Sequence, residues 1–401
     1  MNIVDKKELH NALTDLFKLG IGEDNDDLTI IFGKNQTAFR VRKLDRFYEK
    51  NDSSFIEFGA IITASNEEEK AIVIKDARYF KKAIMGLESE KIKFELVDKK
   101  LVVNGGAIIT EYSDNVTLPV QLTPYKEVTV EGKELFAAYK RTLSHISLNK
   151  DRKQTWKINM AFNKVKQNKM TIGATDGLTA SLTTIPCSDS PELSFYTVYD
   201  IVKVLSKMKG EKVRIGVNTT DRKWYIRYII DNKYVIENSV KKIDIQNVSE
   251  WLKLYYDART TRVTFKISDL KKVVKEVQEK GYSYEHQMKR SQILNLQLEQ
   301  KKLQLSTAIK EDDGTVKFVP LKEKIDEYEV LREEDEVNVF IDVELLNRYL
   351  KEFSKKETSK VTLIFKWETN PIKDPTESHF EIQLEKISGF IGGIMPVRIK
   401  G

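Results

Sequence analysis

Lysine and arginine recur on stretches of this sequence whose apolar residues have the spacing of a helix. Cations on helix faces, without side chains arranged to read base edges, suit contact with phosphates that does not depend on nucleotide sequence. A solvated helix face explains any one cluster equally well, so it is the threefold recurrence that favours phosphate binding. A separate basic stretch, residues 150–157, places an aromatic side chain, Trp156, among cations. The recurring cations are Lys75, Arg78, Lys81, Lys82, Lys203, Lys207, Lys209, Arg348, Lys351, Lys355 and Lys356, with Lys140, Arg141, Lys271, Lys272 and Lys275 on the other helices.

The side chains that catalysis or metal binding requires are not grouped along the chain. The sequence has no Gly-x-x-x-x-Gly-Lys phosphate loop and no Gly-x-Ser-x-Gly nucleophile turn. Its single cysteine, Cys187, excludes an intrachain disulfide and a cysteine-based zinc site. The four histidines stand too far apart for a helical metal pair; they are His10, His145, His286 and His379. We therefore expect no catalytic site, no metal and no cofactor, and an enzyme with dispersed acidic residues that processes DNA is the least favoured alternative.

Length and composition indicate a multidomain protein of the cytoplasm. The chain has 401 residues, enough for about two to four domains. Its formal net charge is +6 with a pI near 8.9, which permits attraction to polyanions without requiring it. No apolar run reaches the roughly 18 residues that span a bilayer, and the N-terminus lacks a signal pattern. We expect no membrane association.

The elements that carry these cations recur three times in the same order. A helix with a charged start is predicted after Lys7, Lys133 and Ser268, and a second helix over residues 74–85, 198–208 and 341–353. Strands with a period of two follow the second helices at 91–96, 212–217 and 360–365. Hairpins are predicted between the two helices, most clearly over 294–305. Each copy is therefore predicted to be an α+β unit with its helices on one face of antiparallel strands, the alternative being chance recurrence of common patterns.

Two segments separate the copies. Residues 118–124 hold two of the eight prolines, and residues 247–260 precede the third copy. The predicted domains are 1–124, 125–254 and 255–401. Charged runs at 310–313 and 322–335 are interpreted as a solvated hairpin or insertion within the third copy.

Two short motifs stand about 220 residues apart in this threefold repeat. The first is Ile-Gly-Ala-Thr-Asp-Gly at residues 172–177, and the second is Ile-Met-Pro-Val-Arg-Ile at residues 394–399. With these motifs the chain resembles the bacterial sliding clamp, the beta subunit of DNA polymerase III. The resemblance covers essentially the whole chain, although the first copy matches in pattern more than in motif.

This resemblance implies a ring-shaped homodimer of six similar domains, with sheets outside and helices lining a hole that holds double-stranded DNA. It implies a processivity factor for DNA replication that has no catalytic site and no cofactor. DNA polymerase and the clamp loader are expected to dock short linear peptides in a cleft between domains 2 and 3. The resemblance places that cleft at Ile158, Thr175, Gly177, Leu178, Ala180, Ile394, Met395, Pro396, Val397, Arg398 and Ile399. The expected DNA-facing residues are Arg78, Lys82, Lys140, Arg141, Arg152, Lys153, Trp156, Lys157, Lys203, Lys207, Lys271, Lys275 and Arg348.

Departures from the family pattern indicate a phage-borne, plasmid-borne or otherwise divergent member. The family's His-Arg-Leu after Asp-Gly is replaced by Leu-Thr-Ala at residues 178–180, which predicts an altered peptide preference. Glu279 and Lys280 stand where an aliphatic pair commonly supports the dimer. These polar residues favour the alternative hypothesis, a monomeric clamp-like adaptor that binds replication or repair proteins without encircling DNA.

Overall fold

Alternation of apolar and polar residues builds most of this chain as antiparallel strands. In the computed structural model, strand β2 (Leu28–Gly33) alternates buried and half-buried positions, and β15 (Lys223–Ile230) does the same. A period of two places every second side chain on the buried face of a sheet. The structure describes residues 2–18, 27–44, 55–67, 69–116, 126–146, 160–188, 191–220, 223–241, 259–286, 289–325, 327–331, 336–351, 353, 358–367, 380–385, 387, 389–394 and 397.

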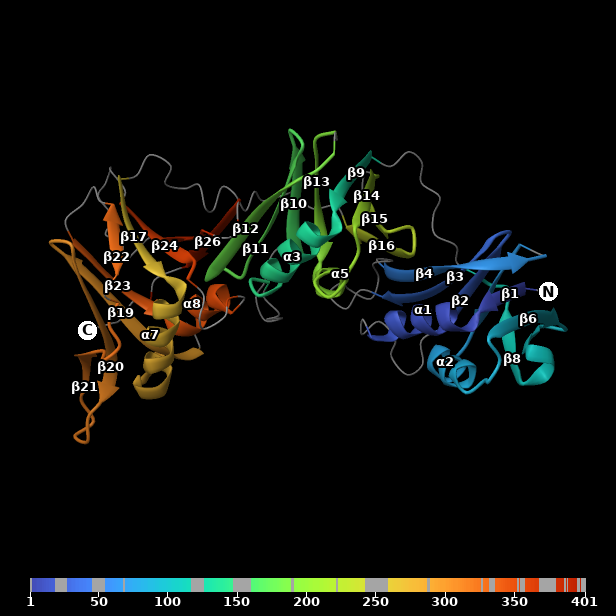
Figure 1. Cartoon of the computed structure of the whole chain (residues 1–401), viewed down its shortest axis with the longest axis horizontal. Helices are drawn as coiled ribbons and strands as arrows, with labels where there is room; N and C mark the ends of the chain where they lie inside the picture. The colour runs from blue at the N-terminus through green and yellow to red at the C-terminus, as the bar shows by residue number, and fades with distance from the viewer. Residues whose placement is uncertain are drawn as a thin grey trace.

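The described elements fall into three repeats of the same order, which lie side by side in an arc (Figure 1). The first repeat contains β1 (Asn2–Asp5), α1 (Lys6–Lys18), β2, β3 (Gln36–Leu44), β4 (Phe55–Asn66), β5 (Lys70–Ile74), α2 (Ala77–Met85), β6 (Lys91–Val97), β7 (Lys100–Val103) and β8 (Ile108–Ser113).

The described elements of the second repeat follow the same order. It contains β9 (Lys126–Glu131), α3 (Gly132–Leu143), β10 (Met160–Lys166), β11 (Lys169–Thr175), β12 (Thr179–Pro186), β13 (Leu193–Val198), α5 (Tyr199–Leu205), β14 (Lys212–Thr219), β15 and β16 (Tyr234–Lys241).

The third repeat adds two short strands, β18 and β22, to that order. It contains β17 (Arg259–Lys266), α7 (Ile267–Lys280), β18 (Ser283–His286), β19 (Lys289–Glu299), β20 (Lys302–Lys310), β21 (Val316–Pro320), β22 (Tyr328–Leu331), β23 (Glu336–Asp342), α8 (Val343–Leu350), β24 (Lys360–Trp367), β25 (Phe380–Leu384) and β26 (Phe390–Ile394).

Every repeat pairs its strands in the same two antiparallel groups. In the first repeat these are β5-β2-β3-β4 and β1-β6-β7-β8. The second repeat has β13-β10-β11-β12 and β9-β14-β15-β16, and the third has β23-β19-β20-β21 and β17-β24-β25-β26. The predicted α+β fold of three similar units is confirmed.

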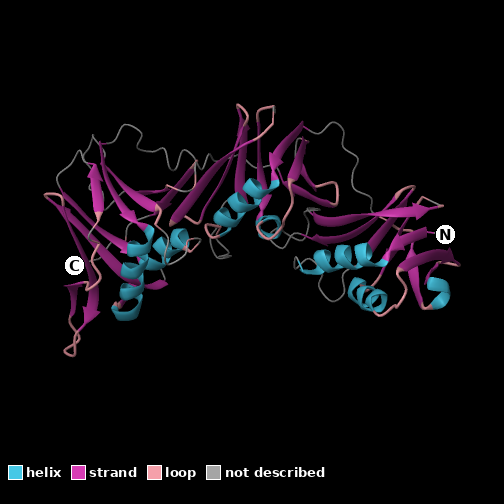
Figure 2. Cartoon of the chain, viewed as in Figure 1, coloured by secondary structure: helices cyan, strands magenta, loops and turns pink. Residues whose placement is uncertain are grey.

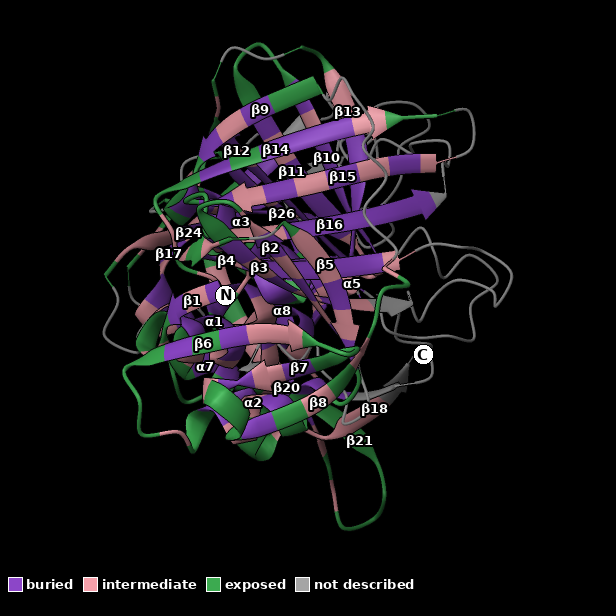
Figure 3. Cartoon of the chain, turned by 90° about the vertical axis from the view of Figure 1, so that its right-hand side faces the viewer, coloured by how far each residue is buried: buried purple, intermediate pink, exposed green. Residues whose placement is uncertain are grey.

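The helices of all three repeats lie along the inner side of the arc, and the strands form its outer side (Figure 2). Each helix turns its apolar residues to the sheets; in α7 the buried positions include Leu270, Val273, Val274 and Val277. The spacing of three and four residues makes one apolar stripe. Buried residues lie mainly along the strands, and exposed residues lie mainly in turns and on the helix faces that point away from the sheets (Figure 3).

The two sequence segments predicted to separate the copies lie mostly outside the described residues. The boundaries at 124 and 254 therefore stay predictions. One detail differs, because Arg259 and Thr260, placed in the second separating segment, already belong to β17 and pair with β24.

The charged insertion of the third repeat is only partly solvated. Its first run forms the exposed turn between β20 and β21, as predicted. Its second run packs against the protein, since Leu321 and Ile325 are buried and the Glu276 carboxylate on α7 accepts the backbone N–H groups of Lys322 and Glu323 at 3.1 and 2.8 Å. A buried carboxylate needs such donors, which explains why this part is not a free loop.

Candidate functional site

The two junctions between repeats are built from strands that hold corresponding positions in the repeat order. At the first, β4 pairs antiparallel with β16, from Tyr234 opposite Ala60 to Ser239 opposite Phe55. At the second, β12 pairs with β26, from Thr179 opposite Ile394 to Thr183 opposite Phe390. Backbone hydrogen bonds thus make one continuous sheet across each junction.

The Ala-Thr-Asp-Gly motif forms the turn between β11 and β12 at the second junction. The Asp176 Oδ1 atom accepts the N–H groups of Leu178 and Thr179 at 2.9 and 2.7 Å, and the Thr175 hydroxyl donates to the Thr179 carbonyl at 2.8 Å. Gly177 has φ 82, a left-handed value that suits glycine. An aspartate that caps its own turn in this way fixes the path of the chain into β12.

Helix α8 of the third repeat reaches this turn with two side chains. The Arg348 guanidinium lies 2.5 Å from the other Asp176 oxygen, Oδ2, and donates to the Thr179 hydroxyl at 3.0 Å. The Tyr349 hydroxyl lies 2.8 Å from the Ala180 carbonyl and 2.7 Å from that of Gly393, which face each other across the paired strands. Burial raises the pKa of the Asp176 carboxyl, but Arg348 and the backbone N–H groups outweigh burial, so this pKa lies below its usual value.

A buried histidine completes the contact. His145 follows α3, and its Nδ1 atom lies 3.0 Å from the Thr179 hydroxyl. The imidazole ring packs against Tyr349 at a tilt of 34°, with the ring centroids 4.6 Å apart. Burial first, and then the positive charge of Arg348, lower the pKa of His145 to about 3, so the ring is neutral at physiological pH.

The predicted cleft residues that the structure describes gather at this junction. Thr175 and Gly177 lie in the turn, Leu178 packs against the core of the third repeat, and Ala180 and Ile394 are fully buried in the paired strands. Val397 is also buried. The cleft role of all of them stays a prediction. Ile158, Met395, Pro396, Arg398 and Ile399 lie outside the described residues.

Most of the cations predicted to face DNA that the structure describes are exposed on the inner helices or just after them. Arg78 and Lys82 lie on α2, Lys140 on α3 and Lys203 on α5, with Lys207 in the turn that follows α5. Arg141 donates to Thr183 at 3.5 Å, Lys271 donates to the Phe353 carbonyl, and the exposed Lys275 pairs with Glu279 at 2.9 Å. Arg152, Lys153, Trp156 and Lys157 lie outside the described residues.

Arg348, which is also predicted to face DNA, makes its described contacts at the second junction. Its side chain is only 23% exposed, and its guanidinium is bound to Asp176 of the second repeat. A carboxylate whose second oxygen is held by backbone donors is a fixed partner for a guanidinium. We therefore treat Arg348 as part of the junction.

The first junction has a different chemistry, a row of charges across four strands. Glu57 of β4 lies opposite Glu237 of β16, and arginines flank both: Arg42 opposite Glu57 and Arg227 opposite Glu237. Both glutamates are buried, and Arg40 bridges them at 2.7 and 3.7 Å. Two carboxylates directly opposed across strands are unfavourable unless cations lie between them, as they do here.

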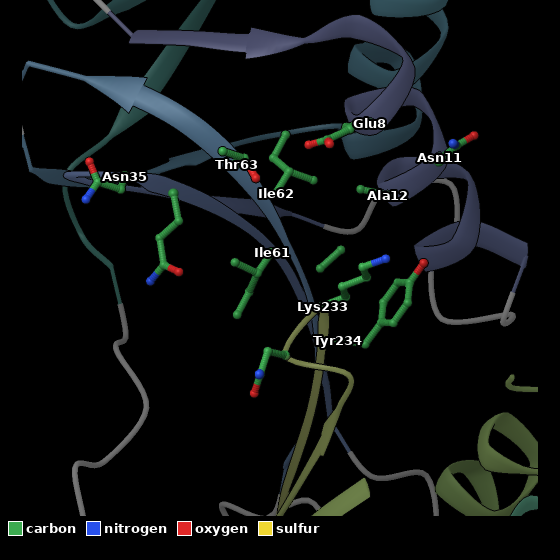
Figure 4. A pocket seen from close by; sticks show the side chains of 12 residues that line it. Glu8, Asn11, Ala12, Asn35, Ile61, Ile62, Thr63, Lys233 and Tyr234 are labelled. Atoms are coloured by element: carbon green, nitrogen blue, oxygen red, sulfur yellow. The ribbon is translucent and has the colours of Figure 1, made fainter. Parts of the chain in front are cut away.

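A groove of about 370 Å³ lies beside the first junction, between α1, β4 and the turn before β16 (Figure 4). The hydroxyl of Tyr234 crosses toward α1 and donates to the Asp15 carboxylate at 2.5 Å. Carboxamides such as Asn11 and Asn35 share the lining with apolar Ile61. The groove mixes polar and apolar groups without a recognisable ligand chemistry.

The two ends of the arc carry strands with an open edge. Strand β8 pairs with β7 through residues 108–111, and no other described strand covers those residues. Strand β21 pairs with β20 alone among the described strands. In the repeat order, β8 corresponds to β16 and β26, and β21 corresponds to β4 and β12. Each end also exposes a large apolar side chain, 59% of Ile109 on β8 and 37% of Val316 on β21.

Comparison with known proteins identifies this architecture. No protein-family model and no curated protein matches the sequence. The structure is similar over its whole length to a DNA polymerase sliding clamp from Bacillus subtilis, with a TM-score of 0.73, 12% sequence identity and coverage of 100% of this chain and 99% of that one. It is likewise similar to the Caulobacter crescentus pol III beta protein, with a TM-score of 0.71, 15% identity and full coverage of both chains. A putative DNA polymerase III beta subunit from Eubacterium rectale gives a TM-score of 0.72 at 15% identity, covering 99% of each chain.

The chain therefore has the sliding-clamp fold. The solved structures that resemble it include those of bacterial DNA polymerase III beta subunits, the family that the two motifs resemble. Within the described part of the chain, every helix is too short or too polar to cross a lipid bilayer.

Several residues at the junctions escaped sequence analysis. Asp176 lies inside the Ala-Thr-Asp-Gly motif, and the motif drew attention to it. Its partner Arg348 stands 172 residues away in the sequence. His145 is a single histidine after a helix, and Tyr349 is one of 16 tyrosines. Nothing in the sequence near Arg348, His145 or Tyr349 distinguishes them from ordinary core or surface residues.

Proposed function

We propose that two copies of this chain close into a ring around duplex DNA and hold a DNA polymerase to it during replication. The observation that carries this proposal is that two strands equivalent to the junction strands, β8 and β21, form no junction among the described strands. Within the chain, β4 binds β16 and β12 binds β26. The remaining members of the series, β21 and β8, stand at opposite ends of the arc (Figure 1). Two copies placed head to tail would pair each β21 with a partner β8 and close a ring of six repeats.

The positive charge on the helices supports the proposal that DNA passes through the ring. Exposed cations lie on α2, α3 and α7 and on and just after α5, on the inner side of the arc (Figure 2). Flexible lysines spread around a ring keep nearly constant contact with phosphates as the ring moves, whereas hydrogen bonds to base edges would hold it at one sequence. The ring would thus slide, act without a catalytic site, and work in the cytoplasm, where a clamp loader would open it.

The second junction supports peptide docking by that polymerase and loader. Aliphatic side chains of residues 175–180 and of the tail after β26 belong to the wall predicted to grip leucine or phenylalanine anchors. Replacing both Met395 and Val397 by alanine is expected to weaken a polymerase-derived peptide while leaving the fold intact.

Covalent closure of the ring tests topology without a loader. In a chain carrying Cys187→Ser, cysteines introduced at Ile109 and Val316 would be joined by a flexible bis-maleimide in the presence of plasmid DNA. Protein linked through both interfaces is expected to stay on circular DNA in detergent and to leave after one restriction cut. Equal retention on circular and linear DNA, or on neither, refutes encirclement.

A monomeric adaptor is the second candidate, and the polar end of α7 favours it. Glu279 pairs with Lys275 and Lys280 pairs with Glu276 on the same helix, so this end offers ion pairs in place of an apolar contact. Sedimentation at micromolar concentration separates the candidates, since the ring predicts twice the chain mass of 46.5 kDa and the adaptor predicts that mass alone.

A further inference from the structure

One ion pair joins the turn of the Ala-Thr-Asp-Gly motif to a helix of another repeat. Asp176 and Arg348 lie 2.5 Å apart, with side chains only 12% and 23% exposed. A hydrogen-bonded pair this shielded from water is stronger than one on the surface.

The Asp176 carboxylate has two separate tasks. Its Oδ1 atom holds the turn by accepting the N–H groups of Leu178 and Thr179, and its Oδ2 atom binds Arg348. The first task is local to the second repeat. The second connects the turn to α8 of the third repeat, so the two tasks can be removed separately.

The turn also meets the third repeat where Thr179 pairs with Ile394 of β26, and just beyond it the Tyr349 hydroxyl donates to the Ala180 carbonyl. The Thr179 hydroxyl receives a hydrogen bond from Arg348 and lies beside His145, and Leu178 packs on the apolar core of the third repeat. These contacts follow from the position of the turn. Arg348 is the charged group of α8 that binds the turn from across the junction.

We propose that Asp176 and Arg348 form a latch that positions the turn 175–179 against α8, and that partner-peptide affinity depends on this latch. The proposal rests on the proposed function, because the turn is one wall of the predicted cleft. Neither residue needs to touch the peptide. The latch sets how far the wall formed by Gly177 and Leu178 stands from the buried Val397, and a groove binds its apolar anchors only at a fitting width.

Asp176→Asn and Arg348→Gln test the latch from both sides. Asparagine keeps an oxygen for the two backbone N–H groups and removes the charge that binds Arg348, so the turn survives without its tie to α8. Each variant is expected to weaken a fluorescein-labelled, polymerase-derived peptide with leucine and phenylalanine anchors by about tenfold. The double variant is expected to lose no more than either single one, because both remove one interaction.

Two further variants separate positioning from general damage. Arg348→Lys retains the positive charge and is expected to recover part of the affinity, whereas Arg214→Gln, at an exposed arginine on β14, is expected to bind like the parent. Amide exchange of Leu178 and Thr179 is expected to accelerate in Arg348→Gln. The latch is refuted if the parent binds peptide and the latch variants bind it equally well, or if their losses add. If the parent binds no peptide, the cleft is refuted, and unchanged amide exchange in Arg348→Gln then refutes the latch as well.

Discussion

Mild acid is expected to weaken the junction between the second and third repeats through His145. In the folded protein, burial and then the neighbouring Arg348 lower the pKa of this imidazole to about 3, against an ordinary value of 6.5. Its ring is enclosed by Tyr349 and the Thr179 hydroxyl, with 2% of the residue exposed. The neutral form is therefore the one that the fold accommodates.

The sign follows from proton binding in the two states. As pH falls through 6.5 the unfolded chain gains a proton on this histidine, and the folded chain gains none until near pH 3. Because the unfolded state then binds more protons, the free energy of unfolding falls with falling pH across this window and is fully retained above it. The slope is at most about 1.4 kcal/mol per pH unit, so pH 5 costs about 2 kcal/mol relative to pH 6.5.

Hydrogen exchange at several pH values provides the assay, because a chain of three repeats need not unfold in one step. After correction for intrinsic exchange, amides of β12 and β26 are expected to lose about 2 kcal/mol of opening free energy between pH 6.5 and 5. His145→Gln keeps a polar group beside Thr179 and is expected to remove this loss, whereas His10→Gln on α1 is expected to retain it. A loss of the same size in His145→Gln would refute the assignment.

Three further predictions concern the other junction contacts. Glu237→Gln is expected to cost about 2 kcal/mol at the first junction, because it leaves the half-buried Arg227 without its carboxylate; hydrogen exchange of β16 measures this, and unchanged exchange contradicts it. Gly392→Ala is expected to cost about 2 kcal/mol or more in thermal unfolding, because the added Cβ would lie 2.4 Å from Tyr349 Cε1. Tyr349→Ala in the same chain should make the glycine substitution neutral, and a purely additive double variant speaks against this contact. Ile109→Lys is expected to halve the sedimenting mass of the ring, and an unchanged mass excludes β8 from the contact between copies.

Sequence patterns predicted the repeat because periodicity is a local property. Alternation in residues 212–217 predicted β14, and apolar spacing after Ser268 predicted α7 within one residue of its observed start at Ile267. The hairpin over 294–305 was also predicted, and Gln300 and Lys301 adopt positive φ at the turn between β19 and β20. In each case the residues that make the pattern are neighbours along the chain.

The junction contacts could not be predicted because their partners are distant in sequence. Arg348 has the position and charge expected of a solvated or DNA-facing cation, and only the approach of the 175–179 turn gives it a carboxylate partner. Similarly, Glu57 and Glu237 look like surface residues of separate strands until β4 and β16 pair. The exposed helix cations were easier to predict, since exposure on a helix follows from the apolar stripe opposite.

The different side chains at the two junctions disfavour wrong pairing between equivalent strands of different repeats. Because backbone hydrogen bonds carry no information about which strand they join, β4, β12 and β21 offer similar edges to β8, β16 and β26. Only side chains can prevent wrong pairings. A β16 strand placed on β12 would take Glu237 away from Arg40 of β3, and it would set the side chain of Asn238 or Glu237 where Tyr349 now fills the space above Gly392. The charged junction and the small-residue junction therefore disfavour the exchange of β16 for β26.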